Sequence, residues 1–189
     1  ENYHWNECLC GLIDETSKEK HHVDIEYLNG DYRVGSAFDI NDISVKYNCE
    51  CGYVNDNLQY TVKNMPSTPL NIGDSITLGI NGVNYDFVLP VYELNIKQVP
   101  VKTDYTEGEL FDPKGLILNK KYLDRFEDYT EFNLDEVTYV EKVLTTQDSF
   151  VEVTYDNLSI KIPVNVRHSS IKVELEDNLS VTYTEGTNV

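Results

Sequence analysis

The sequence predicts an all-β protein, and three observations lead to this prediction. The chain of 189 residues contains 14 Tyr and is rich in Val, Ile and Thr, which are the residue types enriched in strands. Turn-forming Gly, Asn and Asp recur at intervals of about eight to twelve residues, and no apolar stripe with helical spacing is sustained. In residues 150–155 and 158–166 apolar and polar residues alternate. Such alternation places one row of side chains in a core and the other in solvent.

The clearest local element is a hairpin formed by these two alternating segments. Asp156 and Asn157 separate them, and both residue types tolerate the positive φ that a two-residue hairpin turn requires. We therefore expect residues 150–155 to pair with the strand that follows.

Composition excludes two classes of partner. The chain has 15 Lys and Arg against 33 Asp and Glu, a formal net charge of −18. Nucleic acids and anionic lipid headgroups are bound through Lys and Arg, so neither is an expected partner. No apolar run approaches the roughly 20 residues of a membrane span, and we expect no direct membrane insertion. With 40% hydrophobic residues, the chain can nevertheless bury a core.

An internal repeat sets the domain organisation. Residues 105–112 repeat residues 32–39 with the same Tyr, Gly, Phe and Asp, and residues 183–186 begin the pattern a third time. Later positions also match: residues 121–122 with 46–47, Leu144 and Asp148 with Leu70 and Asp74, and residues 162–164 with 89–91. A period near 75 residues is typical of a small domain of about seven strands and not of a solenoid unit.

The repeated positions predict a turn beside a core residue. Gly35 and Gly108 are expected to adopt positive φ, Phe38 and Phe111 to enter the core, and Asp39 and Asp112 to accept hydrogen bonds from backbone amides. Asp39, Asp42 and neighbouring acids could instead ligate calcium, which prefers oxygen ligands. The sequence has no EF-hand loop, and calcium is not expected.

The second repeat resembles the bacterial Ig-like domain of group 3. The resemblance covers about residues 98–168 and is carried by residues 100–116, 122–124, 144–146 and 151–155. Residues 25–97 resemble the same family more weakly, because residues 40–42 replace the Pro-Lys-Gly segment and residues 49–52 occupy the first hairpin tip. The resemblance implies tandem immunoglobulin-like β-sandwiches in secreted or surface-attached bacterial proteins, and it brings no catalytic residues.

The four cysteines form two Cys-x-Cys-Gly segments, residues 8–11 and 49–52. Residues 4–22 resemble short His-Trp-x-x-Cys-x-x-Cys-Gly motifs of bacterial surface proteins, with one residue instead of two between the cysteines. Three interpretations stay open. Two thiolates and two imidazoles can bind zinc in a tetrahedral site, disulfides can join the two pairs, with cross-pairing preferred on strain, and the thiols can be free or share one four-thiolate site. The zinc interpretation uses His4, Cys8, Cys10, His21 and His22, and the disulfide interpretation uses Cys8, Cys10, Cys49 and Cys51.

No catalytic constellation is found, and we expect the protein not to be an enzyme. Three of the four His belong to the terminal segment and His168 lies at the second domain boundary, so no base remains for a nucleophile in the two predicted domains. Phosphate-binding Gly loops, Gly-x-Ser-x-Gly and His-Glu-x-x-His are missing from the sequence. The many Tyr in both repeats are expected to fill cores, although Tyr rings on a surface could bind sugars.

We therefore expect four segments: a Cys/His-containing segment over residues 1–24, Ig-like domains over 25–97 and 98–168, and the start of a further repeat or a terminal strand segment over 169–189. Residues 169–189 are expected to fray or to pair along a sheet edge. The expected function is that of a tandem spacer, stalk or adhesion module in a fragment of a secreted or cell-surface bacterial protein. Its expected partners are neighbouring Ig-like domains of the same longer chain. The alternative is a module, attached to a secreted enzyme or adhesin, that binds carbohydrate, in the cell wall or on a host, or a host protein.

Overall fold

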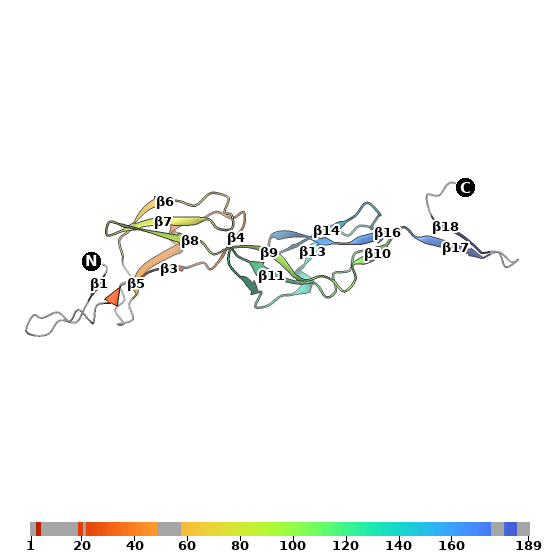
Figure 1. The fold of residues 1–189 in the computed structure, drawn as a ribbon, viewed down its shortest axis with the longest axis horizontal. Coiled ribbons are helices and arrows are strands. Elements are labelled where there is room, and N and C mark those ends of the chain that lie inside the picture. Colours follow the sequence, from red (N-terminus) through yellow and green to blue (C-terminus); the bar gives the residue numbers. More distant parts are fainter. Residues whose placement is uncertain (1–2, 5–18, 21, 49–57, 175–179, 185–189) are drawn as a thin grey trace, which may run out of the picture. The chain divides into compact units, whose positions relative to one another are not determined.

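The protein is described by a computed structural model that covers residues 3–4, 19–20, 22–48, 58–174 and 180–184. The all-β prediction is confirmed. Strands dominate, several sheets are present and none closes on itself (Figure 1). In the described ranges the helical elements are two short 3-10 turns, η2 (Ile40–Asp42) and η3 (Leu134–Glu136).

The chain divides into two compact units, residues Glu1–Tyr92 and Glu93–Val189. In the first unit, β3 (His22–Tyr27) pairs with β5 (Ile43–Asn48) in an antiparallel sheet. A second antiparallel sheet has the order β6-β7-β8, from β6 (Thr61–Asn64), β7 (Ser75–Ile80) and β8 (Val83–Val88). The short β4 (Tyr32–Arg33) pairs in parallel with the start of β9 (Val91–Gln98).

The two sheets of the first unit contribute to one core. Along β7 the side chains alternate between partly buried and buried, as expected for a strand with one face in a core. The buried members of this core come from β4, β5, β7 and β9 and from the segments that precede β7 and β9; they are Tyr32, Ile43, Val45, Leu70, Ile76, Leu78, Ile80, Leu89 and Val91.

The second unit repeats this order of strands with one addition, β12, and has its 3-10 turn at a different place in the order. Residues 93–98 of β9 pair with β11 (Ile117–Lys121), which pairs with β12 (Phe126–Asp128). Another antiparallel sheet has the order β13-β14-β15, from β13 (Thr138–Tyr139), β14 (Phe150–Tyr155) and β15 (Leu158–Pro163). The strand β10 (Asp104–Thr106) pairs in parallel with β16 (Asn165–Arg167). Its core consists of buried residues from five strands and the segments between them: Leu94, Tyr105, Phe111, Leu116, Leu118, Val137, Leu144, Val151, Val153, Tyr155, Ile162 and Val164.

The predicted hairpin is confirmed. Strands β14 and β15 pair over their full length, and Asp156 and Asn157 in the turn have φ of 49° and 59°. The first unit has the same hairpin in β7 and β8, with Asn81 and Gly82 at φ of 49° and 81°. Both turns therefore need residues that tolerate positive φ at two successive positions.

The repeated Tyr-Gly motif forms the same turn in each unit. Gly35 has φ 87° and Gly108 has φ 99°, which confirms the predicted conformation. The Gly35 amide donates to the carbonyl oxygen of Leu70, and the Leu70 amide donates to the carbonyl oxygen of Ser36, both at 2.9 Å. In the second unit Gly108, Leu144 and Glu109 repeat these two bonds at the same 2.9 Å. The sequence match of Leu70 with Leu144 is therefore a structural equivalence.

One sequence match is wrong. The sequence match of residues 89–91 with residues 162–164, each with a Pro at its centre, predicts that these segments are equivalent. Tyr32 pairs with Val91, whereas its counterpart Tyr105 pairs with Val166. Val91 therefore corresponds to Val166, and the two proline residues occupy positions that differ by two residues along the final strands.

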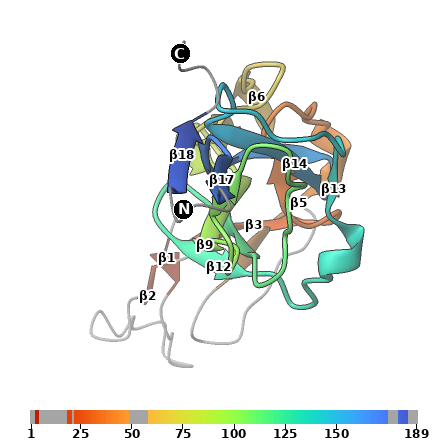
Figure 2. The same ribbon diagram turned by 90° about the vertical axis from the view of Figure 1, so that its right-hand side faces the viewer.

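Two further strand pairs lie near the ends of the chain. The strand β1 (Tyr3–His4) pairs with β2 (Glu19–Lys20), and β17 (Ser170–Glu174) pairs with β18 (Ser180–Thr184) in an antiparallel hairpin (Figure 2). The prediction for residues 169–189 was fraying or pairing along a sheet edge. The described strands of that segment instead pair with each other.

Candidate functional site

The residues predicted to bind zinc or to form disulfides lie at the edge of the described chain. Cys8, Cys10, His21, Cys49 and Cys51 fall outside the described residues. For His4 and His22 the backbone is described: His4 belongs to β1, and His22 begins β3 opposite Asn48, the residue that precedes Cys49 in the sequence. Zinc, disulfides and free thiols remain predictions. Within the described part of the chain, no three His, Cys, Asp or Glu side chains are grouped so that they could hold a metal ion.

The repeated aspartates are engaged in local hydrogen bonds. An oxygen of Asp39 accepts from the backbone amide of Asn41 at 2.9 Å and from the Asn41 side-chain amide at 2.8 Å. Asp112 accepts from the amide of Lys114 at 3.0 Å. The predicted role of both aspartates, as acceptors for backbone amides, is confirmed. Asp42 accepts from the side chain of Asn29, so both carboxylates considered for calcium have amide donors as partners.

The tyrosines belong to the cores. Every Tyr side chain that the structure describes is buried or half-buried. Tyr85 and Phe87 are stacked with an interplanar angle of 18°, but both pack against the core of the first unit. A sugar platform needs a ring face in solvent, and packing against the core limits the exposure of the Tyr85 and Phe87 rings. This agrees with the prediction that the described Tyr rings serve the fold.

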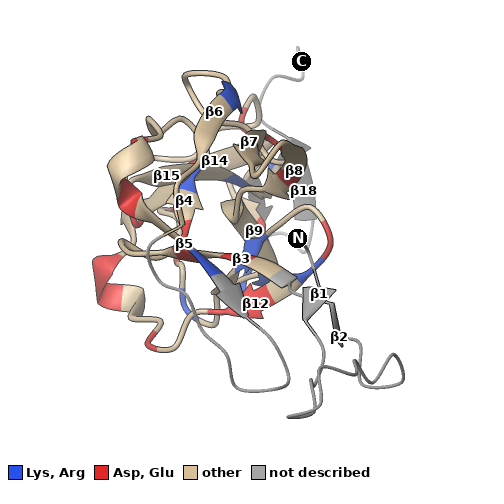
Figure 3. Ribbon diagram, turned by 90° about the vertical axis from the view of Figure 1, so that its left-hand side faces the viewer, with Lys and Arg blue, Asp and Glu red and all other residues tan. Residues whose placement is uncertain are grey.

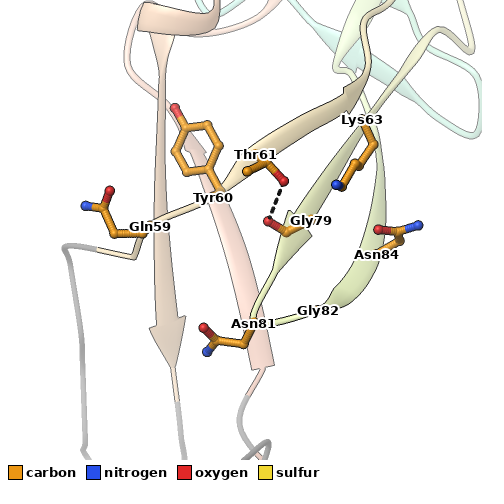
Figure 4. A pocket seen from close by; sticks show the side chains of 8 residues that line it. All are labelled: Gln59, Tyr60, Thr61, Lys63, Gly79, Asn81, Gly82 and Asn84. Carbon is orange, nitrogen blue, oxygen red and sulfur yellow. Dashed lines mark hydrogen bonds between the residues drawn. The ribbon is translucent and has the colours of Figure 1, made fainter.

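A hollow lies on the outer face of the β6-β7-β8 sheet. It has a volume of about 400 Å³ and is lined by Gln59, Tyr60, Thr61, Lys63, Gly79, Asn81, Gly82 and Asn84 (Figure 4). Sequence reasoning missed it, because its residues come from three strands and a turn and form no motif.

Gly79 makes this hollow. It lies in β7 between Thr61 of β6 and Asn84 of β8. A Cβ atom at this position would lie 2.5 Å from Cε of Lys63 and 2.9 Å from Oγ1 of Thr61. The Lys63 side chain therefore lies across the backbone where another residue would place its own side chain. Thr61 fixes one wall by donating from Oγ1 to the carbonyl oxygen of Gly79 at 3.3 Å.

The lining combines polar groups with apolar surface and has one charge. Its only cationic residue is Lys63 of β6, a strand that is partly coloured blue for Lys and Arg in Figure 3. None of the eight lining residues is acidic. Gln59, Asn81 and Asn84 supply amide groups that can both donate and accept hydrogen bonds. Such a set can bind a small polar ligand, but it contains no nucleophile paired with a base.

Comparisons with protein families, curated proteins and solved structures found no match to this chain. Among the described residues no helix is long and apolar enough to span a bilayer.

Proposed function

We propose that this chain is a pair of tandem immunoglobulin-like β-sandwich domains that serves as a non-catalytic spacer or stalk in a secreted or cell-surface bacterial protein. The resemblance to the group 3 bacterial Ig-like domain motivates the fold, the location and the bacterial source. The repeated order of strands in the two units supports the same fold. The partners in this proposal are neighbouring Ig-like domains of the same longer chain.

The observation that carries the spacer proposal is the parallel pairing of an early strand with the last strand in each unit. In the first unit β4 pairs with β9, and in the second unit β10 pairs with β16. Backbone hydrogen bonds beyond the paired residues extend this contact. The amide of Val34 donates to the carbonyl oxygen of Tyr92 at 2.9 Å, and the amide of Glu107 donates to the carbonyl oxygen of Arg167 at 2.8 Å.

This pairing suits a domain that bears tension. In a parallel pair the incoming end of the early strand and the outgoing end of the last strand lie at opposite ends of the pair. Tension along the chain then pulls the two strands past each other and loads their hydrogen bonds together. An antiparallel terminal pair, with both chain ends on one side, would open one bond at a time. A spacer between a cell surface and another module needs the first arrangement.

Single-molecule pulling on residues 1–189, held at the two termini, tests the proposal. We expect two separate unfolding events, each releasing about 70 residues, or roughly 23–25 nm of extended chain. Glu107→Pro removes the amide donor to Arg167 and should lower the unfolding force of one event while the other stays unchanged. Val34→Pro should lower the other event. Unfolding without resolvable force, or forces indifferent to both substitutions, would contradict the spacer proposal.

A further inference from the structure

The hollow on the β6-β7-β8 sheet carries a second inference, independent of the load-bearing role. The chain has about twice as many acidic as basic residues, and several cations elsewhere in the described chain are neutralised by them. Ion pairs with Asp or Glu are formed by Lys46, Lys97, Lys102, Lys121 and Lys142. No Asp or Glu of the described chain lies within ion-pair distance of Lys63. Its ammonium group therefore faces the hollow with its charge unmatched by the described residues.

The other residues that line the hollow indicate which groups a ligand would carry besides a negative charge. The side-chain amides of Gln59 and Asn84 can each donate to and accept from hydroxyl groups. Gly79 forms the floor beneath the Lys63 side chain, and Tyr60 adds a half-buried ring at one side. The volume of about 400 Å³ lies in the range of small-molecule sites. A ligand that uses all of these groups carries one negative charge and several hydroxyls on a compact ring.

We propose that this hollow binds an acidic saccharide, a pyranose ring that carries a carboxylate. The carboxylate accepts from the ammonium group of Lys63, and the ring hydroxyls exchange hydrogen bonds with the surrounding amides. The net charge of −18 does not prevent this. At physiological salt the Debye length is about 8 Å, so distant carboxylates are screened while Lys63 acts at contact distance.

The second unit supplies a natural counterpart without the hollow's floor. Thr154 pairs with Ser159 as Gly79 pairs with Asn84, and Thr138 donates to the carbonyl oxygen of Thr154 at 3.4 Å as Thr61 does to that of Gly79. The hydroxyl groups of Thr154 and Ser159 lie 2.9 Å apart. Thr154 therefore places a side chain where Gly79 has none. Gly79→Thr transfers this arrangement into the first unit and should displace Lys63.

The test is NMR titration of the full chain with cellobiouronic acid and, as matched probe, cellobiose, which lacks only the carboxylate. Saturable shifts are expected at the amides of Gly79, Asn81 and Gly82, with cellobiose at least about tenfold weaker because a charge-assisted hydrogen bond is missing. Lys63→Gln and Gly79→Thr should each weaken binding of the acidic disaccharide about tenfold or more. Lys161→Gln, an equal charge change on the second unit, should leave it unaltered.

Each other outcome overturns the proposal. Equal affinity for the two disaccharides, or an affinity indifferent to Lys63→Gln, removes the role of the charge. Shifts that map away from β6, β7 and β8 place the site elsewhere. Absence of saturation up to high millimolar concentration means that the hollow is not a site for this ligand. Unchanged amide spectra of the variants outside the hollow verify that they fold, and the pulling experiment is unaffected by any of these results.

Discussion

The two units share a set of backbone hydrogen bonds but differ in the side chains at equivalent positions. Comparing them separates the contacts that the fold requires from the contacts that are specific to one unit. The Tyr-Gly turn, the Leu that it bonds and the two-residue hairpin recur in both units. At the equivalent positions Tyr32 and Tyr105, Gly79 and Thr154, and Ser36 and Glu109, the side chains have different partners. Shared bonds mark the fold, and differences at matched positions mark where a site or a change in stability can arise.

The largest effect is expected at the shared leucines. Leu70 and Leu144 are each fully buried, at 0% exposure. The backbone of each forms two hydrogen bonds with the backbone of the Tyr-Gly turn. Leu70→Ala and Leu144→Ala should each lower the free energy of unfolding of their own unit by about 2–5 kcal/mol. Urea unfolding followed through NMR amide signals of each unit measures this. A cost below 1 kcal/mol at either position would break the equivalence of the two turns.

The tyrosines that open the motif should differ. The hydroxyl group of Tyr105 donates to the carbonyl oxygen of Lys102 at 3.0 Å and accepts from the amide of Asp112 at 3.1 Å. The hydroxyl group of Tyr32 is buried without a hydrogen-bond partner in the described chain. Burial, followed by the charges of Asp42 and Asp39 and by Tyr27, raises the pKa of Tyr32 to about 12.

Tyr105→Phe should therefore cost about 1–3 kcal/mol, because it leaves the Asp112 amide without its acceptor, while Tyr32→Phe should be neutral or stabilising. The raised pKa gives a second readout. Neutral Tyr32 stabilises the first unit below about pH 10, and this contribution is lost as the pH rises through about 12. Tyr32→Phe should weaken the alkaline loss of stability of that unit. Equal costs for the two substitutions would show that the hydroxyl environments are alike.

Sequence reasoning reached the fold through features that are local. Turn chemistry at Asp156 and Asn157, the glycines with positive φ and alternation along residues 150–155 depend on neighbours within a few positions, and each prediction about them is confirmed. The register of the final strands depends on pairing between residues about 60 positions apart, and matching two prolines gave the wrong register. The hollow depends on a side chain that Gly79 lacks and on Lys63 from another strand, so no single segment indicates it.

The exchange of Gly79 and Thr154 should give a smaller effect of opposite sign in the two units. Thr is favoured over Gly in strands by about 1 kcal/mol, so Thr154→Gly should destabilise the second unit by about that amount, and its bond with Ser159 would also be lost. Gly79→Thr should stabilise the first unit by less than that, because Lys63 and Thr61 must move. Thermal unfolding of the single variants and of the double exchange measures both. Destabilisation by Gly79→Thr exceeding about 1 kcal/mol would mean that Lys63 cannot leave its position.

The smallest expected effect is on the stability of the second unit at low pH. Hydrogen bonds from the Lys142 side chain, then from the Thr145 amide, lower the pKa of Asp148. Hydrogen bonds from Lys102, then from the Thr106 amide, lower the pKa of Glu109. A carboxyl group with a lowered pKa in the folded state stabilises that state above its unfolded pKa of about 4 and loses this contribution as the pH falls through the lower folded value.

Glu109 has no acidic counterpart in the first unit, where Ser36 occupies its place. Glu109→Gln should therefore reduce the difference in stability of the second unit between about pH 7 and about pH 3, while Ser36→Ala should leave the corresponding difference of the first unit unchanged. The Glu109 carboxylate lies at the surface, where ion pairs contribute little, so the effect of Glu109→Gln appears as a shallower pH dependence and not as a loss of folding. Urea midpoints at the two pH values, read from amide signals of β14 and β7, provide the measurement. An identical pH dependence in the wild type and in Glu109→Gln would show that the Lys102 and Thr106 contacts do not favour the charged carboxylate.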